Sequence, residues 1–305
     1  MVNECRKLKQ EIATPSENCL NLVPTIGACA TLACIWEATA AKPGNVYRGA
    51  DFDDLTYADF LTSAAMIGPI IDRTPELGVG ATVLAAVEAT RAAVATNTNL
   101  GMLLLIAPLA AAEGTVPLAV GIPRLLAELT ERDTEHVYAA IRVVQPGGLG
   151  KVDEADVNAA PPAITLTAAM QLAADRDLVA RQYANDFADV FWLADGIQAA
   201  VDNAQPLNDA IILAYLELLA RQPDTLIARK CGLSVAEEAS AQAAAVLAAR
   251  EHSTEAYRDA LADFDFWLRA DAHRRNPGTS ADLIAAALFV LLREGRLNWP
   301  VRFYN

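Results

Sequence analysis

The sequence is short of positive charge, of aromatic side chains and of long hydrophobic runs. Its 305 residues include 24 Lys and Arg against 38 Asp and Glu, so the net charge is −14. A chain this acidic, without a basic patch, fits a nucleic-acid backbone poorly, and we expect no nucleic-acid partner. No apolar run approaches the roughly 18 residues of a membrane span, so we expect no membrane contact. Because 53% of the residues are hydrophobic, the composition excludes a disordered chain and favours a large core.

Cysteine and histidine are too few and too scattered to indicate a disulfide framework or a zinc site. The five cysteines form no C-x-x-C pair, and the three histidines are His136, His252 and His273. The N-terminus starts with charged residues and shows no apolar signal segment. We therefore expect reduced thiols and a cytoplasmic protein.

Alternating β-branched patterns are rare, whereas apolar residues recur at helical spacing. Two stripes, each on one face of a helix, consist of Phe60, Ala64, Ile67 and Ile71, and of Ile211, Ile212, Tyr215, Leu218 and Leu219. Thr56 and Asp59 resemble a capping box ahead of the first stripe. The alanine-rich stretches 236–250 and 281–293 have high helix propensity. These patterns predict an all-α fold.

Breaker residues suggest how the chain is organised. We predict a tail or short helix over residues 1–25 and one multi-helix globular domain with a central pocket over 26–305. Irregular stretches are expected at 41–54, 145–150, 159–162 and 276–280, where Pro and Gly gather. The stretch near 145–162 could be a hinge between subdomains. A loop within one domain is the better interpretation, because the apolar pattern resumes at 164–172.

Five polar blocks carry the candidate chemistry. The first contains Glu37, Lys42, Gly44 and Asn45. A lysine beside a glycine suits a phosphate, but Lys in a last turn followed by Pro and Gly is also an ordinary helix end. The local pattern alone favours the helix end.

The second block contains Arg48 and three carboxylates, Asp51, Asp53 and Asp54. Such a group could bind Mg²⁺, which takes one or two carboxylates together with substrate phosphates. It could equally be a solvated acidic loop at the start of the next helix. The pattern by itself favours the solvated loop.

The third and fourth blocks each precede a predicted helix. The third, at 95–101, includes Asn97, Thr98 and Gly101 and suits either an anion site or a plain N-cap. In the fourth, Thr225 and Arg229 share a helix face, and Asp224 fits an N-cap. An N-cap explains Asp224 but not two adjacent basic residues, Arg229 and Lys230, in a chain with few of them.

The fifth block runs from His273 to Asp282 and leads into a strongly apolar helix. Its arginines, at 274 and 275, could cap the preceding helix. Ser280 and Asp282 would lie in the first turn of the next helix. A phosphate between the arginines and that N-terminus is physically reasonable, and capping is the alternative.

Taken in order, the five blocks resemble the triphosphoribosyl-dephospho-CoA synthase family over residues 30–294. That family's pattern is approximately E-x₄-P-K-P-G-x-V, G-A-H-x-D, N-T-H-K-G, D-T-x₃-R-x-G and S-P-G-G-S-A-D-L. The corresponding segments here are Glu37 with A-K-P-G-N-V at 41–46, G-A-D-F-D at 49–53, N-T-N-L-G at 97–101, D-T-L-I-A-R-K-C-G at 224–232 and N-P-G-T-S-A-D-L at 276–283.

The resemblance implies an all-α enzyme that joins ATP to 3′-dephospho-CoA and releases adenine. This is glycosyl transfer at the ribose C1′, so it needs a group that activates a hydroxyl and a proton donor for the leaving base. It also needs positive charge or Mg²⁺ at the phosphates. The partners would be a nucleotide or phosphoribosyl donor and a hydroxyl acceptor, with a homo-oligomer as a further possibility.

The resemblance also suggests roles for individual residues. Those for phosphate or nucleotide binding are Lys42, Gly44, Asn45, Arg48, Asn97, Thr98, Gly101, Thr225, Arg229, Ser280 and Asp282. The candidate catalytic residues are Glu37, Asp53 and Asp224, and the candidate Mg²⁺ ligands are Asp53 and Asp224. The resemblance does not distinguish which carboxylate is the base. The underlying hypothesis is that loops far apart in the sequence converge on one Mg²⁺-assisted cavity for a phosphorylated pentose.

Three positions depart from the family pattern. Asp51 stands where the pattern has His, and Asn99 and Leu100 replace a His-Lys pair. Loss of that lysine removes a phosphate contact, which points to a divergent branch. Relatives of this type resemble proteins of tetrahydromethanopterin-dependent one-carbon metabolism, so phosphoribosyl transfer onto a precursor of that cofactor is an alternative. A non-catalytic nucleotide- or cofactor-binding protein is a second alternative, and a purely structural helical protein a third.

Overall fold

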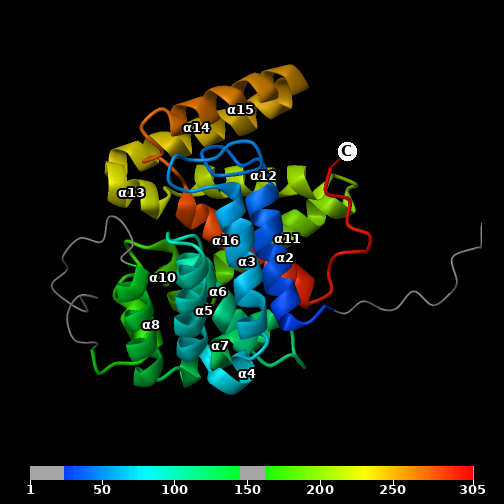
Figure 1. Ribbon diagram of the computed structural model, residues 1–305. Coiled ribbons are helices and arrows are strands. Elements are labelled where there is room, and N and C mark those ends of the chain that lie inside the picture. The colour runs from blue at the N-terminus through cyan, green and yellow to red at the C-terminus, as the bar shows by residue number, and fades with distance from the viewer. Residues whose placement is uncertain (1–23, 145–161, 305) are drawn as a thin grey trace, which may run out of the picture.

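A computed structural model of the chain describes residues 24–144 and 162–304, and these residues form an all-helical structure (Figure 1). Fifteen helices lie in this part of the chain, and its one β-bridge joins Tyr47 and Ala50. The helices are α2 (Ile26–Thr39), α3 (Tyr57–Ile71), α4 (Thr74–Leu77), α5 (Val79–Ala93), α6 (Leu100–Ala111), α7 (Leu118–Glu128), α8 (Glu131–Val144), α9 (Leu166–Gln171), α10 (Leu178–Ala184), α11 (Ala188–Asp202), α12 (Leu207–Arg221), α13 (Thr225–Cys231), α14 (Leu233–His252), α15 (Thr254–Arg269) and α16 (Gly278–Arg293).

Helix α16 forms the centre of the core. Thirteen of its sixteen residues are buried, and it contacts α2, α6, α10, α11, α12 and α13. A helix that is apolar on nearly every face must be covered on every face, which explains this central position. The consecutive alanines at 285–287 are fully buried. Their small side chains allow the surrounding helices to approach closely.

A second buried helix, α6, contacts α16 and is flanked by α5 and α7. Ten of its twelve residues are buried, including Pro108 within the helix. In Figure 1, α4, α5, α7 and α8 gather at one end of the molecule, and α13, α14 and α15 lie at the other. The first turns of α6 and α16 lie between these two groups, and both helices begin at predicted polar blocks.

The fold confirms the sequence-based prediction of an all-α domain. The Thr56–Asp59 capping box is present at the start of α3, with both reciprocal hydrogen bonds formed. Both predicted apolar stripes face the core, on α3 and α12. Stretches 236–250 and 281–293 lie inside α14 and α16. The irregular stretch at 41–54 is non-helical, as predicted.

One predicted boundary is wrong. The irregular stretch expected at 276–280 ends earlier, because α16 begins at Gly278 and already includes Ser280. The predicted N-terminal tail up to residue 23 and the irregular stretches at 145–150 and 159–161 lie outside the described residues. Within the described part of the chain, no helix combines the length and the apolar character that a membrane crossing requires.

Candidate active site

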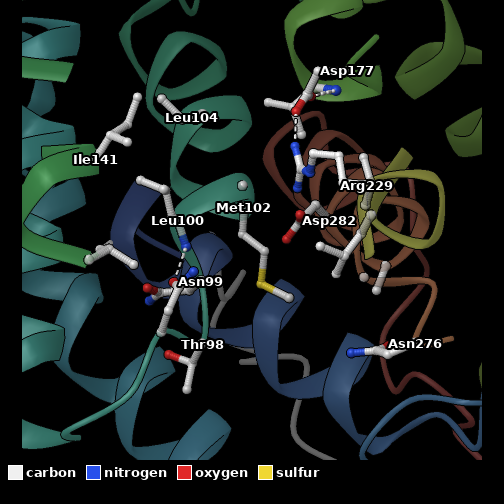
Figure 2. A pocket seen from close by; sticks show the side chains of 18 of the residues that line it. Thr98, Asn99, Leu100, Met102, Leu104, Ile141, Asp177, Arg229, Asn276 and Asp282 are labelled. Atoms are coloured by element: carbon white, nitrogen blue, oxygen red, sulfur yellow. Dashed lines mark hydrogen bonds and ion pairs between the residues drawn. The ribbon is translucent and has the colours of Figure 1, made fainter. Parts of the chain in front are cut away.

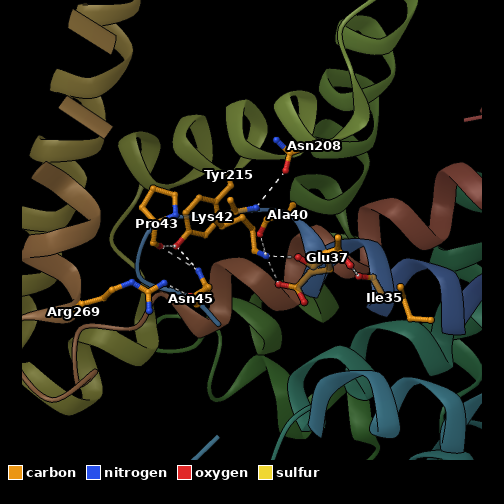
Figure 3. A network of polar contacts seen from close by, with 11 residues as sticks. Ile35, Glu37, Ala40, Lys42, Pro43, Asn45, Asn208, Tyr215 and Arg269 are labelled. Carbon is orange, nitrogen blue, oxygen red and sulfur yellow. Dashed lines mark hydrogen bonds and ion pairs between the residues drawn. The ribbon is translucent and has the colours of Figure 1, made fainter. Parts of the chain in front are cut away.

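The first polar block ends α2 with a buried ion pair. Lys42 is 0% exposed and Glu37 is 2% exposed, and 2.9 Å separates Lys42 Nζ from Glu37 Oε1 (Figure 3). Lys42 Nζ also donates hydrogen bonds to the carbonyl oxygens of Glu37 and Ala40. The ammonium is thus fully used in closing the helix, which corrects the prediction that Lys42 holds a phosphate.

Glu37 keeps one free oxygen. Its Oε2 is buried and lacks a hydrogen-bond partner, and the residue lines a cavity. Burial raises the pKa of the Glu37 carboxyl, and the neighbouring Lys42 partly offsets this rise. The carboxylate therefore has one oxygen held by the fold and a second that is buried without a partner, in a residue on the cavity wall.

The loop after Lys42 is fixed by α12 and α15 (Figure 3). Asn45 Nδ2 donates to Tyr215 Oη at 2.6 Å, and Tyr215 Oη donates to the Pro43 carbonyl oxygen at 2.8 Å. Gly44 has a φ of +74°, and a Cβ there would lie 2.8 Å from Leu268. Gly44 is therefore required by packing, away from the cavity, whereas Asn45 lines the cavity.

The second block is exposed, and Asp54 is the carboxylate of this block that lines the cavity. Arg48, Asp51 and Asp53 are exposed and do not line the cavity, and Asp51 Oδ1 accepts a hydrogen bond from the Tyr57 backbone N–H at 2.6 Å. This is the solvated, helix-capping loop that the local pattern favoured. The predicted roles of Arg48 in phosphate binding and of Asp53 in catalysis or metal binding lack support, because neither side chain reaches the cavity.

The third block forms a wall of the cavity, and its side chains are held by α3 and α5. Thr98 Oγ1 donates to Ser63 Oγ at 2.6 Å, and Asn99 Nδ2 donates to Thr90 Oγ1 at 3.2 Å. Asn97 Oδ1 accepts from the Leu100 backbone N–H, so this block also caps α6. Asn97, Thr98 and Gly101 all line the cavity, and nucleotide binding by them stays a prediction.

Gly101 is needed because a carboxylate packs directly against its Cα. A Cβ at Gly101 would lie 2.0 Å from Asp282 Oδ2. The glycine of the third block and the aspartate of the fifth therefore form one contact, between the first turns of α6 and α16.

Asp282 is a half-buried carboxylate of the cavity wall. No described residue donates a hydrogen bond to it or forms an ion pair with it. Burial raises its pKa well above the usual value of 3.8, and the negative charges of Glu37, Asp224 and Asp177 add to the rise. A carboxyl in this setting keeps its proton to a higher pH than an exposed aspartate does.

Asp224, in contrast, belongs to the framework. It is 0% exposed and accepts four hydrogen bonds: Oδ1 from the N–H groups of Leu226 and Ile227, and Oδ2 from the N–H and hydroxyl of Ser280. Asp224 thus caps α13 and ties it to α16. It cannot bind metal or reach a substrate in this arrangement, which corrects its predicted role, and Ser280 is turned away from the cavity for the same reason.

The same framework holds Thr225 and Arg229. Thr225 Oγ1 accepts from the Leu178 N–H and donates to Thr279 Oγ1, each at 3.2 Å, and does not line the cavity. Arg229 does line it and forms an ion pair with Asp177, the N-cap of α10 (Figure 2). Its Nε is buried without a partner, which leaves one donor unused.

These walls enclose a cavity of about 860 Å³. That volume suits a ligand of nucleotide size. Seven predicted residues line it, namely Glu37, Asn45, Asn97, Thr98, Gly101, Arg229 and Asp282, while Lys42, Gly44, Arg48, Asp53, Asp224, Thr225 and Ser280 do not. Loops distant in the sequence do converge on one cavity, but about half of the predicted polar residues support its walls from behind or lie on the surface.

Several lining residues were not among the predicted site residues. Lys230, His273 and Arg274 add nitrogen donors, and Asp177 adds a carboxylate. Lys230 and Arg274 could have been found as clustered basic residues in a chain with few of them. The local sequence around Asp177 is compatible only with the N-cap of a helix. Its pairing with Arg229 spans 52 residues, so no local pattern could have indicated it.

The described residues include no group of three His, Cys, Asp or Glu side chains arranged to hold a metal ion. The predicted pair of Mg²⁺ ligands does not fit this structure. Asp53 is on the surface, and both carboxylate oxygens of Asp224 already accept hydrogen bonds from protein groups. Any Mg²⁺ here would depend on substrate phosphates for most of its ligands.

Comparison with known proteins agrees with this arrangement. Residues 24–301 match the family of ATP:dephospho-CoA triphosphoribosyl transferases. A crystal structure from Archaeoglobus fulgidus, provisionally named a triphosphoribosyl-dephospho-CoA synthase, matches with 28% identity and a TM-score of 0.60, covering 77% of this chain and 99% of that one. No curated protein matches significantly. The chain belongs to the ATP:dephospho-CoA triphosphoribosyl transferase family and is a transferase of the glycosyl type.

Proposed function

We propose that the chain moves the triphosphoribosyl group of ATP from adenine to a hydroxyl of 3′-dephospho-CoA. The bond from C1′ to the adenine nitrogen breaks and a bond from C1′ to the acceptor oxygen forms. The hydroxyl loses a proton and the leaving adenine gains one. The family match supports triphosphoribosyl transfer, and the cavity supplies groups for each of these steps.

Two carboxyl groups with different surroundings support an acid–base pair. Asp282 has no protein partner and its pKa is raised by burial and by neighbouring carboxylates, so it suits the role of proton donor to adenine. Glu37 is paired with Lys42, which favours its ionised form, and its free Oε2 suits a base for the hydroxyl. Groups whose surroundings separate their protonation behaviour commonly divide acid and base roles in this way.

The phosphates would lie against the cationic part of the wall. Arg229, Lys230 and Arg274 contribute donors there, and the ammonium of Lys230 has no partner among the described residues. We include Mg²⁺ in the proposal, held mainly by the phosphate oxygens of the substrate. When bound, the ion would neutralise phosphate charge.

The observation that carries the proposal is the unpartnered Asp282 carboxyl on the wall of a nucleotide-sized cavity. The test is adenine release from ATP, followed by chromatography, with and without dephospho-CoA and Mg²⁺. We expect adenine to appear only with an acceptor, and to fall at least 100-fold in Asp282→Asn. Asp202→Asn, on the exposed end of α11, is the matched control and should behave as wild type. Nucleotide binding without adenine release would contradict the proposal.

A second candidate acceptor is a precursor of tetrahydromethanopterin, onto which a phosphoribosyl group would be transferred. It is favoured by Leu100, which puts an apolar side chain on the cavity wall where the family pattern has lysine. The two candidates separate in one assay. Rapid adenine release with dephospho-CoA would exclude the second, whereas release only with the pterin precursor would establish it.

A further inference from the structure

The cavity is divided into two chemically different halves. In Figure 2, Leu100, Leu104 and Ile141 lie on one side, and Asp177, Arg229 and Asp282 lie on the other. The side chain of Met102 stands between the two groups. A ligand that fills the whole cavity must therefore match two environments.

The first half is built by α6, α8 and α9. The lining residues that α8 and α9 contribute are apolar except for the hydroxyl of Tyr138, and those of the first turns of α6 include Leu100 and Leu104, each 7% exposed. We call this the apolar half, and its main lining side chains are Leu100, Leu104, Ile141, Val144 and Met170.

The charged residues that line the cavity do not belong to α6, α8 or α9. Lys230 and Arg274 come from α13 and from the segment before α16. Arg91 and Arg176 are exposed, and each donates to a carbonyl oxygen of its own segment, that of Ala95 or Leu172. Two polar side chains next to Leu100 are tied to the fold, since Thr98 is bonded to Ser63 and Asn99 to Thr90.

An apolar wall next to Leu100 disfavours a phosphate at that position. An anion there would lose its hydration without gaining a charged partner. An uncharged ring or aliphatic group would instead remove apolar surface of both partners from water, which is favourable. The unpartnered ammonium of Lys230 stands among the cations of the opposite half, where an anionic group finds its partner.

We propose that the apolar half binds an uncharged ring-bearing part of the acceptor, and that Leu100 selects for it, while the anionic part lies toward Lys230 and Arg274. The identification of the bound group as part of the acceptor rests on the transferase activity proposed above. The division of the cavity depends on its lining residues alone, so ligand binding can test it without turnover.

The test compares two phosphate monoesters of equal charge, 1-naphthyl phosphate and glycerol 3-phosphate, by isothermal titration calorimetry. We expect the wild type to bind the aryl ester at least about 10-fold more tightly, because only that ester can fill the apolar half. Lys230→Gln should weaken both esters by a similar factor, of about five-fold, and so leave their ratio unchanged.

Leu100→Lys should reduce the preference for the aryl ester to less than about 3-fold, because it places an ammonium in the apolar half. Ile141→Gln is a second test at a half-buried position, in case the first variant does not fold by circular dichroism. The control is Leu172→Lys, an exposed leucine that does not line the cavity, which should keep the wild-type ratio.

Equal binding of both esters by the wild type would overturn the inference, and so would folded Leu100→Lys and Ile141→Gln variants with the wild-type ratio. The adenine assay is a separate readout. A protein that prefers the aryl ester but releases no adenine keeps this inference and loses the proposed function. One that releases adenine but binds both esters equally keeps the function and loses the inference.

Discussion

Asp224 and Asp282 are two carboxylates with opposite surroundings: Asp224 is fully buried in the framework, and Asp282 is half-buried on the cavity wall. Burial raises the pKa of both. Asp224 accepts four hydrogen bonds from α13 and α16, whereas no described residue donates one to Asp282. A buried carboxylate whose oxygens are fully bonded stabilises the fold, and one without bonds costs stability. The difference indicates that the partner of Asp282 is a ligand.

Glu37 is intermediate between these two, and Lys42 is what keeps it so. Replacing Lys42 by Met leaves a buried carboxylate without its cation, which costs about 3–5 kcal/mol in the free energy of unfolding. Urea denaturation measures this, and it is the largest effect we expect. The double variant Glu37→Gln/Lys42→Met should recover part of the loss. A change below about 1 kcal/mol would show that the pair is not buried in solution.

Asp224→Asn should reduce stability by about 1–3 kcal/mol and leave the activity of the folded protein nearly unchanged. Asparagine still caps α13 through its oxygen, but its NH₂ group cannot accept from the Ser280 N–H, which is then buried without a partner. Asp282→Asn should do the opposite, with adenine release lost and stability kept. Equal losses in both properties for both variants would remove the distinction between framework and site.

The unpartnered Asp282 also predicts a pH dependence of stability in the ligand-free protein. Its pKa is raised on folding, so above about pH 3.8 the folded state holds a proton that the unfolded state has released. The stability contributed by that proton therefore falls as pH rises toward the raised pKa, by at most about 1.4 kcal/mol per pH unit. Melting temperatures from pH 4 to 8 should show Asp282→Asn gaining on the wild type as pH rises. A constant difference would mean that Asp282 is not buried as described.

Asp53→Asn should give the smallest effect, within about 0.5 kcal/mol in stability and about two-fold in adenine release, because its side chain is exposed. The same assay used for Asp282→Asn checks this. A loss above about ten-fold would place Asp53 in the active site and extend the comparison to a fourth carboxylate.

Much of the fold could be predicted because its determinants are local or periodic. The apolar stripes of α3 and α12, the Thr56–Asp59 capping box and the alanine-rich α14 and α16 all follow from spacings of three or four residues. Ser280 lies in the first turn of α16, as predicted, but its N–H is bonded to Asp224, 56 residues earlier in the chain. A contact at that separation has no local signal.

The same limit applies to the site. Order and composition identified five polar blocks and, through the family resemblance, the class of reaction. Order and composition did not distinguish the polar side chains that hydrogen-bond within the protein from those that line the cavity. Lys42 and Asp282 differ in this respect only because Lys42 finds three acceptors at the end of α2, while Asp282 meets the bare Cα of Gly101.

The sequence by itself determined that this chain is helical, where most of its helices run, and which family it resembles, because helix periodicity and short motifs are properties of neighbouring residues. Only the tertiary structure decided that Asp224 supports the wall while Asp282 lines the cavity, and that the cavity has an apolar half. Those outcomes depend on which donors and apolar surfaces distant helices bring to each side chain. Burial and hydrogen bonding between such helices exist only once α6, α13 and α16 are packed together.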